Sequence, residues 1–300
     1  MILIAVLYLI CASTFTISKN ALNYADPIFF TGVRMTLSGI LLLSYHLVRN
    51  GYSLRLKRDH YLLFGQVVLF YIYLAYVFDI LALQHLTSAK ACLLYDLSPF
   101  ITALFSYFAF REVMTTKKWV GLSIGLVGFL PSLLSQAARE AAPVGVPFLL
   151  PEGLMLGAVV SSVYGWVVVR KLVREGSYSP VLINGVAMLG GGLLALLTSF
   201  FWEGWYTAPV TNVGQFALYT GLIILTSSVL FSNLYAYLLK KYSATLLSFA
   251  GFTAPLFAAL LGGIFLGETV SWDFFVTTGF VVFGIYLFYQ EELKQGYVLD

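Results

Sequence analysis

Three charged residues lie inside long apolar runs of this sequence: Asp79, Lys90 and Asp96. Only 10% of the residues are charged and 60% are hydrophobic, so a charge in such a run is unusual. Within a lipid bilayer a charge costs about 2.5–3.5 kcal/mol on the insertion scale, and it is usually paired or faces an aqueous path. These three residues are therefore the first candidates for binding a polar ligand.

Asp79 and Lys90 lie at equal distances from the turn at Gln84-His85. Two antiparallel helices leaving this turn place the two side chains at a similar depth, where we expect an ion pair. The pair either clamps the hairpin or forms an outer gate or a site for a zwitterionic substrate. Both interpretations are compatible with the sequence.

Asp96 follows Tyr95 and precedes Pro99 by three residues. By the expected helix boundaries it lies near the middle of the membrane. Its carboxyl group either bonds to a neighbouring helix or contacts a cationic or amino group of a substrate. A proton-coupling role is the further alternative.

Polar and aromatic side chains on two other helices extend this candidate site. Tyr71 and Tyr235 are expected to face a cavity and to stack on a planar or cationic substrate. Ser228 and Asn233 are expected either to hydrogen-bond the substrate or to bond neighbouring helices. Arg34 either extends to the membrane surface, which we favour, or binds a carboxylate.

The sequence offers no support for catalysis. His46, His60 and His85 lie near expected helix ends or in loops without metal-ligand spacing, and Cys11 and Cys92 lie in apolar runs. Neither nucleophile-elbow, zinc-protease nor Walker motifs are present. We therefore predict no enzyme, catalytic residue, metal site or cofactor. A receptor function is not supported, because we find no ligand-binding domain in the sequence. The net charge of +3 gives no sign of nucleic-acid binding.

The apolar runs predict an all-α polytopic membrane protein. Each is long enough to cross a hydrocarbon core of about 30 Å as a helix, and short polar connections separate them. The ten expected transmembrane helices span residues 2–19, 28–48, 61–83, 87–110, 118–135, 152–171, 180–202, 215–239, 244–266 and 273–290.

Half of the chain repeats. Pro99 and Pro255 are 156 positions apart, as are Glu112 and Glu268, within similar apolar stretches. The expected units are a first five-helix repeat at 1–136, a linker at 137–151, a second five-helix repeat at 152–290 and a C-terminal tail at 291–300.

Each repeated residue has two possible roles. A proline inside a helix removes a backbone donor, so Pro99 and Pro255 either shape packing or serve as hinges. Glu112 and Glu268 lie at helix ends, where cap or loop contacts are expected.

The distribution of Lys and Arg gives the repeats an orientation. These residues concentrate in the connections after the second, fourth, sixth and eighth helices, which predicts cytoplasmic termini. A five-helix unit repeated once must insert its second copy inverted. Inverted repeats with a site between them are a common plan of secondary transporters.

The motifs themselves resemble the drug/metabolite transporter superfamily, specifically its ten-helix EamA-type members. The resemblance covers nearly the whole chain. It is carried by Leu86-Thr87-Ser88-Ala89, Leu97-Ser98-Pro99, Phe110-Arg111-Glu112, Trp119-Val120-Gly121 and Gly125 to Gly128, with a weaker second copy from Ala254-Pro255 through Leu266-Gly267-Glu268 to Gly284.

This resemblance implies a central cavity, alternating access without ATP and a small-molecule substrate. The family's substrates include amino acids, S-adenosylmethionine, nucleotide sugars, sugar phosphates and drugs. The charges at Asp79, Lys90 and Asp96 suit a zwitterion, and the aromatics suit an adenosyl group, so S-adenosylmethionine is the specific expectation. The expected location is a bacterial inner membrane, as a monomer or homodimer. A coupled proton or counter-substrate is a possible further partner.

Overall fold

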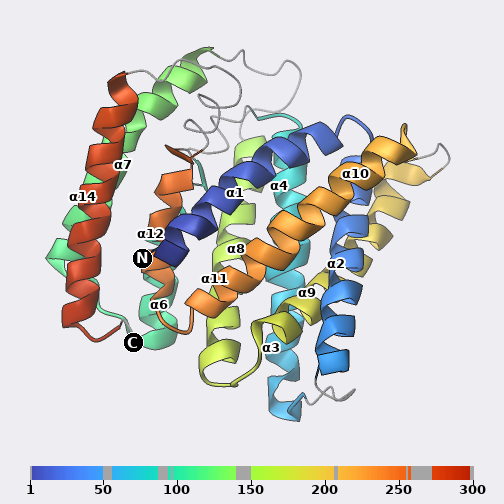
Figure 1. The fold of residues 1–300 in the computed structure, drawn as a ribbon, viewed down its shortest axis with the longest axis horizontal. Coiled ribbons are helices and arrows are strands. Elements are labelled where there is room, and N and C mark those ends of the chain that lie inside the picture. The colour runs from blue at the N-terminus through green and yellow to red at the C-terminus, as the bar shows by residue number, and fades with distance from the viewer. Residues whose placement is uncertain are drawn as a thin grey trace.

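The computed structural model describes residues 2–49, 56–86, 94–95, 97–139, 150–205, 209–254, 256–257 and 272–297. The elements within these ranges are helices (Figure 1), and an isolated antiparallel bridge joins Ala25 to Val210. Five helices in the described ranges are long and apolar enough to cross a membrane, and shorter apolar helices accompany them. The prediction of an all-helical polytopic membrane protein is confirmed. Four residues predicted from the sequence lie outside the described residues: Lys90, Asp96, Pro255 and Glu268.

Within the span expected at 87–110 the described helix begins only at Ser98, so Pro99 lies in its first turn and not inside the helix. The described helices otherwise follow the expected spans. In the first half they are α1 (Ile2–Ala21), α2 (Pro27–Arg49), η1 (Arg58–His60), α3 (Tyr61–Gln66), η2 (Val67–Leu74), α4 (Ala75–Leu83), α6 (Ser98–Phe110) and α7 (Thr116–Arg139). In the second half they are α8 (Leu150–Arg174), α9 (Pro180–Ser199), η3 (Phe200–Gly204), α10 (Val213–Ile223), η4 (Ile224–Phe231), α11 (Ser232–Leu238), α12 (Ala244–Ala250), η5 (Gly251–Thr253) and α14 (Trp272–Lys294).

Local sequence explains where several of these helices begin. The side chains of Ser179, Asn212 and Ser243 accept hydrogen bonds from the backbone N–H groups three residues later, at 3.3, 3.1 and 3.0 Å. These caps satisfy donors that a helix leaves unpaired in its first turn. Pro180 follows the first cap, where its missing N–H costs nothing.

Three of the described spans contain π-helical segments that the sequence pattern did not predict. The third span is π-helical through η2 and the eighth through η4, each over eight residues, and the seventh ends in the five-residue segment η3. Val67 and Ile224, where η2 and η4 begin, are 157 positions apart, close to the offset of the sequence repeat. Such segments are rare and often accompany functional sites.

Glycines allow α2 and α9 to pack with their backbones almost in contact. A Cβ atom at Gly32 would lie 2.8 Å from Leu196, and one at Gly39 would lie 2.3 Å from the backbone of Leu189. Residue numbers rise along α2 as they fall along α9, so the two helices are antiparallel. Since α2 and α9 are the second helices of the two halves, this orientation is the one that an inverted repeat requires.

Helices α7 and α14, the last helices of the two halves, are also antiparallel and lie side by side (Figure 1). A Cβ atom at Gly121 would lie 2.8 Å from the carbonyl oxygen of Gly284, and one at Gly128 would lie 2.2 Å from Phe280. Helices α6 and α12 also pair across the halves. Gly121 and Gly128 therefore allow the close approach of α7 and α14.

The first and third helices of the two halves also pack against each other. Helix α1 packs against α10 and η4, while α8 packs against η2 and α4. Thus the first helix of each half contacts the third helix of the other half. The interior between these helices therefore takes residues from both halves.

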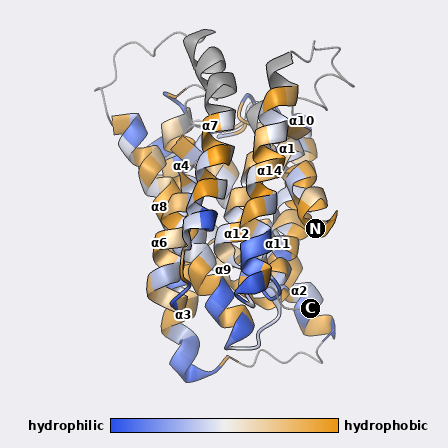
Figure 2. Ribbon diagram, turned by 90° about the vertical axis from the view of Figure 1, so that its left-hand side faces the viewer, coloured by the Kyte–Doolittle hydropathy of each residue, from blue (hydrophilic) through white to orange (hydrophobic). Residues whose placement is uncertain are grey.

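The flanks of the bundle are apolar, and hydrophilic residues gather toward one end (Figure 2). Large apolar side chains on the flanks are exposed, among them Leu41, Leu193 and Phe283. An apolar belt of this kind is the surface that a bilayer covers.

Candidate substrate-binding site

Arg34 of α2 is buried between aromatic rings in the interior. Its side chain is 6% exposed, and its guanidinium carbon lies 5.4 Å from the ring centre of Phe30 and 5.0 Å from that of Tyr76. The favoured expectation that Arg34 extends to the membrane surface is therefore wrong. A buried arginine placed over ring faces is stabilised by cation–π attraction.

Asp79 is the acidic partner of this region. It is half-buried on α4, a helix that packs against α2, and it interacts electrostatically with Arg34. Tyr95, another predicted site residue, packs against the buried apolar cluster that includes Ala82 of α4. The predicted partner of Asp79 was Lys90, which lies outside the described residues, as does Asp96.

Three aromatic side chains from both halves pack ring against ring in a continuous row, with tilted planes at 54° and 35° to one another. The Trp166 ring centre lies 4.4 Å from that of Tyr71 and 4.1 Å from that of Tyr235. Gly165 permits this approach, since a Cβ atom there would lie 2.4 Å from Tyr71. Tyr8 of α1 also interacts with Tyr235 and donates a 2.5 Å hydrogen bond to the carbonyl oxygen of Leu247. We name the rings of Tyr71, Trp166 and Tyr235 the aromatic stack.

Sequence reasoning missed Trp166, although a signal was present. Tryptophan in membrane proteins concentrates at the two interfaces. Trp166 lies well inside α8, eight residues before its end at Arg174. Such a position indicates an internal role, here between the two predicted tyrosines.

The polar groups on η4 and α11 divide into two kinds. Asn233 accepts a hydrogen bond from Asn184 of α9 at 3.1 Å and donates to the carbonyl oxygens of Ser228 and Val229 at 3.2 and 2.9 Å. These contacts match the alternative of interhelical bonding. The hydroxyl group of Ser228 is fully buried and has no partner among the described residues. Ser228 therefore retains the capacity to bind a ligand.

The backbone forms a tight turn just before each repeated proline. Leu97 donates a 3.2 Å hydrogen bond to the carbonyl oxygen of Leu94, three residues earlier, and Pro99 stands in the first turn of α6. The 3₁₀ turn η5 precedes Pro255 in the second half. Ser98 and Ser248 then link α6 to α12 through a 3.2 Å hydrogen bond. The described turns place irregular backbone at equivalent points in the two halves.

The comparisons with known proteins agree with this architecture. The family model of the EamA-like transporter family matches residues 1–134 and 149–290. The chain belongs to the EamA-like transporter family. It is therefore an integral, multi-pass membrane protein and a transporter.

Among its relatives is an S-adenosylmethionine/S-adenosylhomocysteine transporter of Chlamydia trachomatis serovar L2, 40% identical over 97% of this chain and 89% of that protein. A protein of the same name from Chlamydia muridarum is 40% identical over 97% of this chain and 92% of its own length. The inner membrane transporter YedA of Escherichia coli K12 is 28% identical over 94% of this chain and 87% of that protein. A solved crystal structure shares the fold, with a TM-score of 0.77 at 19% identity, covering 95% of this chain and 94% of that one.

Two buried ion pairs join the halves of this EamA-like transporter at one end. Glu112 pairs with Arg170, and Lys118 pairs with Glu292 at 2.5 Å. Glu112 was expected to make cap or loop contacts at a helix end, and it instead forms an ion pair with the other half. Each pair takes one residue from each half, so separating the halves at this end requires breaking both pairs.

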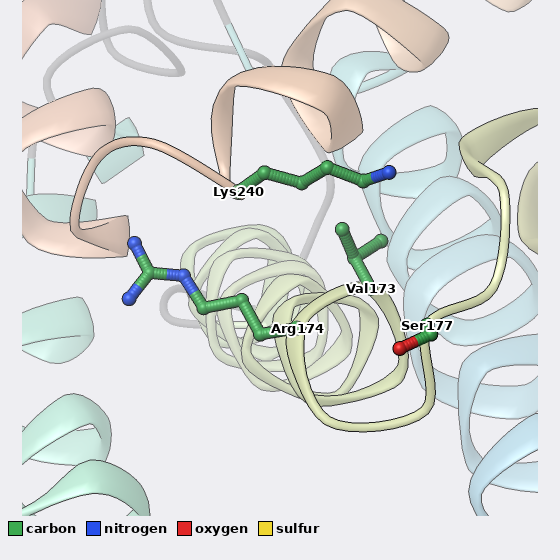
Figure 3. A pocket seen from close by; sticks show the side chains of 4 residues that line it. All are labelled: Val173, Arg174, Ser177 and Lys240. Atoms are coloured by element: carbon green, nitrogen blue, oxygen red, sulfur yellow. The ribbon is translucent and has the colours of Figure 1, made fainter. Parts of the chain in front are cut away.

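A shallow pocket of about 330 Å³ lies at the end of α8 (Figure 3). It is lined by Val173, Arg174, Ser177 and Lys240, and the two basic side chains point in different directions (Figure 3). Arg174 donates hydrogen bonds to the carbonyl oxygens of Leu239 and Tyr242 at 2.8 and 3.1 Å. Because this contact ties α8 to the α11–α12 connection, we interpret Arg174 as structural and place the substrate elsewhere.

Proposed function

We propose that this transporter carries S-adenosylmethionine and S-adenosylhomocysteine. The observation that supports this most directly is the 40% identity, across nearly the whole chain, to relatives named as transporters of these two compounds. Transport, without catalysis, is the function that we assign to the chain.

The interior provides chemistry suited to such a substrate. S-adenosylmethionine carries a sulfonium, an ammonium, a carboxylate and an adenine ring. We propose that Asp79 holds the cationic end, with Tyr95 beside it, and that the aromatic stack provides a surface for the adenine or the sulfonium. The unpartnered hydroxyl of Ser228 supplies a further hydrogen bond. Asn233 supports the site by fixing η4 and α11 to α9.

We propose that the two halves, divided near residues 137–151, alternate access to this site. Pro99 and Pro255 act as the hinges of the fourth and ninth spans. A counter-substrate or a coupled proton drives the cycle, in a monomer or a homodimer.

We also propose that the chain lies in the inner membrane of a bacterium with both termini in the cytoplasm, because Lys and Arg concentrate in the connections on that side. A fluorescent protein fused to the C-terminus should be bright in cells, while alkaline phosphatase fused there should be inactive. An active phosphatase fusion would contradict the proposed orientation and place the C-terminus on the other side of the membrane.

The proposed substrate is tested with the purified full chain reconstituted into liposomes. Labelled S-adenosylmethionine should enter, and unlabelled S-adenosylhomocysteine in excess should compete with it. Methionine, ATP and a hexose phosphate should compete weakly. Liposomes without protein are the control. Uptake of ATP or the hexose phosphate without uptake of S-adenosylmethionine would overturn the proposal.

A further inference from the structure

Among the described residues, Arg34 is a buried interior cation without a direct acidic partner. The direct ion pairs among the described residues are Glu112–Arg170 and Lys118–Glu292. Arg34 interacts with Asp79 electrostatically, but no pair within contact distance joins them in the described part of the chain. Its Nε atom is buried and has no hydrogen-bond partner there.

The other arginines near helix ends show what a structural arginine looks like in this protein. Arg170 pairs with Glu112 and lies 4.3 Å from the ring centre of Phe110, although its Nε and Nη1 atoms, like Nε of Arg34, have no hydrogen-bond partner among the described residues. Arg174 donates to two backbone carbonyl oxygens. An unmet donor on a buried cation is costly, because it loses its hydration without replacement. Arg34 differs from Arg170 in having no direct ion pair among the described residues, in a span where such a charge is expensive, which points to a ligand that completes it.

A carboxylate is the ligand that fits Arg34 best. The guanidinium group presents a rigid fork of donors that matches two carboxylate oxygens, and the ring centres of Phe30 and Tyr76 lie 5.4 and 5.0 Å from its carbon. Helix α4, which carries Asp79, packs against α2, which carries Arg34. An anion receptor beside a cation receptor is complementary to the zwitterionic head of an α-amino acid.

We infer that Arg34 is a substrate-binding residue that recognises the α-carboxylate, so that the site selects the amino-acid end of its substrate as well as the nucleoside end. This inference rests on the proposed function. It adds a prediction about substrate specificity. A substrate that lacks the carboxylate should bind less tightly, because it cannot form the contact with Arg34.

The test measures binding of two compounds to the purified full chain. One is S-adenosylmethionine, and the other is decarboxylated S-adenosylmethionine, which keeps the adenosine, the sulfonium and the amine. The unaltered chain should prefer the first by about tenfold or more, as expected for a charge-assisted hydrogen-bonded contact. Arg34→Gln should weaken S-adenosylmethionine binding by about 10- to 100-fold and leave the decarboxylated compound nearly unchanged. Arg34→Lys should fall between them, because it keeps the charge and loses the fork.

Arg49 provides the matched control, since it ends the same helix, is exposed and donates to Tyr45. Arg49→Gln should keep the full preference. The inference is overturned if the unaltered chain binds both compounds equally, or if Arg34→Gln keeps the preference. Should Arg34→Gln fail to fold, an unchanged preference in Arg34→Lys overturns it as well. If the unaltered chain binds neither compound, it is the proposed function that fails.

Discussion

At the scale of single residues, Asp79 is the acidic group on which the proposed cation site depends. Asp79→Asn keeps the size of the side chain and removes its charge. We expect the affinity for S-adenosylmethionine to fall about tenfold, as for loss of one charge-assisted contact, with little change in thermal stability. Binding to the purified protein measures this. Asp59→Asn, at an exposed position in η1, is the control and should bind normally. Equal affinities in the two variants would exclude Asp79 from the site.

Trp166 makes a second residue-scale prediction, because both tyrosines of the aromatic stack contact it. Trp166→Ala should weaken substrate binding by about 1–2 kcal/mol through loss of ring contact, while Trp166→Phe should lose only part of this. Binding titration with S-adenosylmethionine provides the measurement. The control is Trp119→Ala, at a ring that is 43% exposed on the flank of α7. A larger loss in Trp119→Ala than in Trp166→Ala would contradict the assignment.

What the sequence could predict at this scale was which residue types are unusual in apolar runs. Asp79 was selected in this way, because burial of a polar group is costly whatever its neighbours are. Tyr71 and Tyr235 were selected because their helices are equivalent in the two repeats and carry polar neighbours. Their partners could not be found. The interaction of Arg34 with Asp79 joins two helices, α2 and α4, and depends on helix rotation rather than on spacing along the chain. The ring contacts of Trp166 depend on helix rotation in the same way, although its position inside its helix was a signal.

At the scale of elements, Gly39 sets the distance between α2 and α9. Gly39→Ala places a methyl group 2.3 Å from the Leu189 backbone, so the helices must separate. We expect a loss of about 1–3 kcal/mol in unfolding free energy, as for an overpacked core. Thermal unfolding of the detergent-purified protein tests this. Gly65→Ala in α3 is the matched control, since its Cβ atom would meet nothing within 4 Å. That substitution should be neutral or slightly stabilising, because alanine favours helix.

Helix positions were predictable because length and hydropathy alone decide whether a segment crosses a bilayer. The segments expected at 180–202 and 215–239 are observed at Pro180–Gly204 and Val213–Leu238. The π-helical stretches η2 and η4 were not predictable, since inserting one residue into a helical turn leaves an apolar pattern nearly unchanged. In the folded chain both segments pack against helices of the opposite half, η2 on α8 and η4 on α1. We attribute the π-helical turns to this packing, which exists only after folding.

At the scale of the whole molecule, the two cross-half ion pairs link the two halves at one end. Lys118 is 1% exposed and Glu292 is fully buried, so neither charge is hydrated in this conformation. Alternating access requires this end to open, which hydrates the four charges as the pairs break. The balance between closed and open forms should therefore respond strongly to loss of one partner.

The measurement uses a reporter cysteine at Ala244, which is 1% exposed at the start of α12, in a chain with Cys11 and Cys92 replaced by alanine. Lys118→Met leaves Glu292 buried without its cation, and opening is the least costly way to hydrate it. Each 1.4 kcal/mol toward the open form should speed labelling by a hydrophilic maleimide about tenfold. Lys117→Met is the control, because Lys117 is the exposed neighbour. A second reporter at the exposed Ser177 should label quickly in every variant. If the cysteine of Ala244→Cys were labelled equally fast in the Lys118→Met and Lys117→Met variants, the ion pairs would contribute to packing and not to gating. A faster rate in Lys118→Met alone would identify this end of the transporter as one that opens during the cycle.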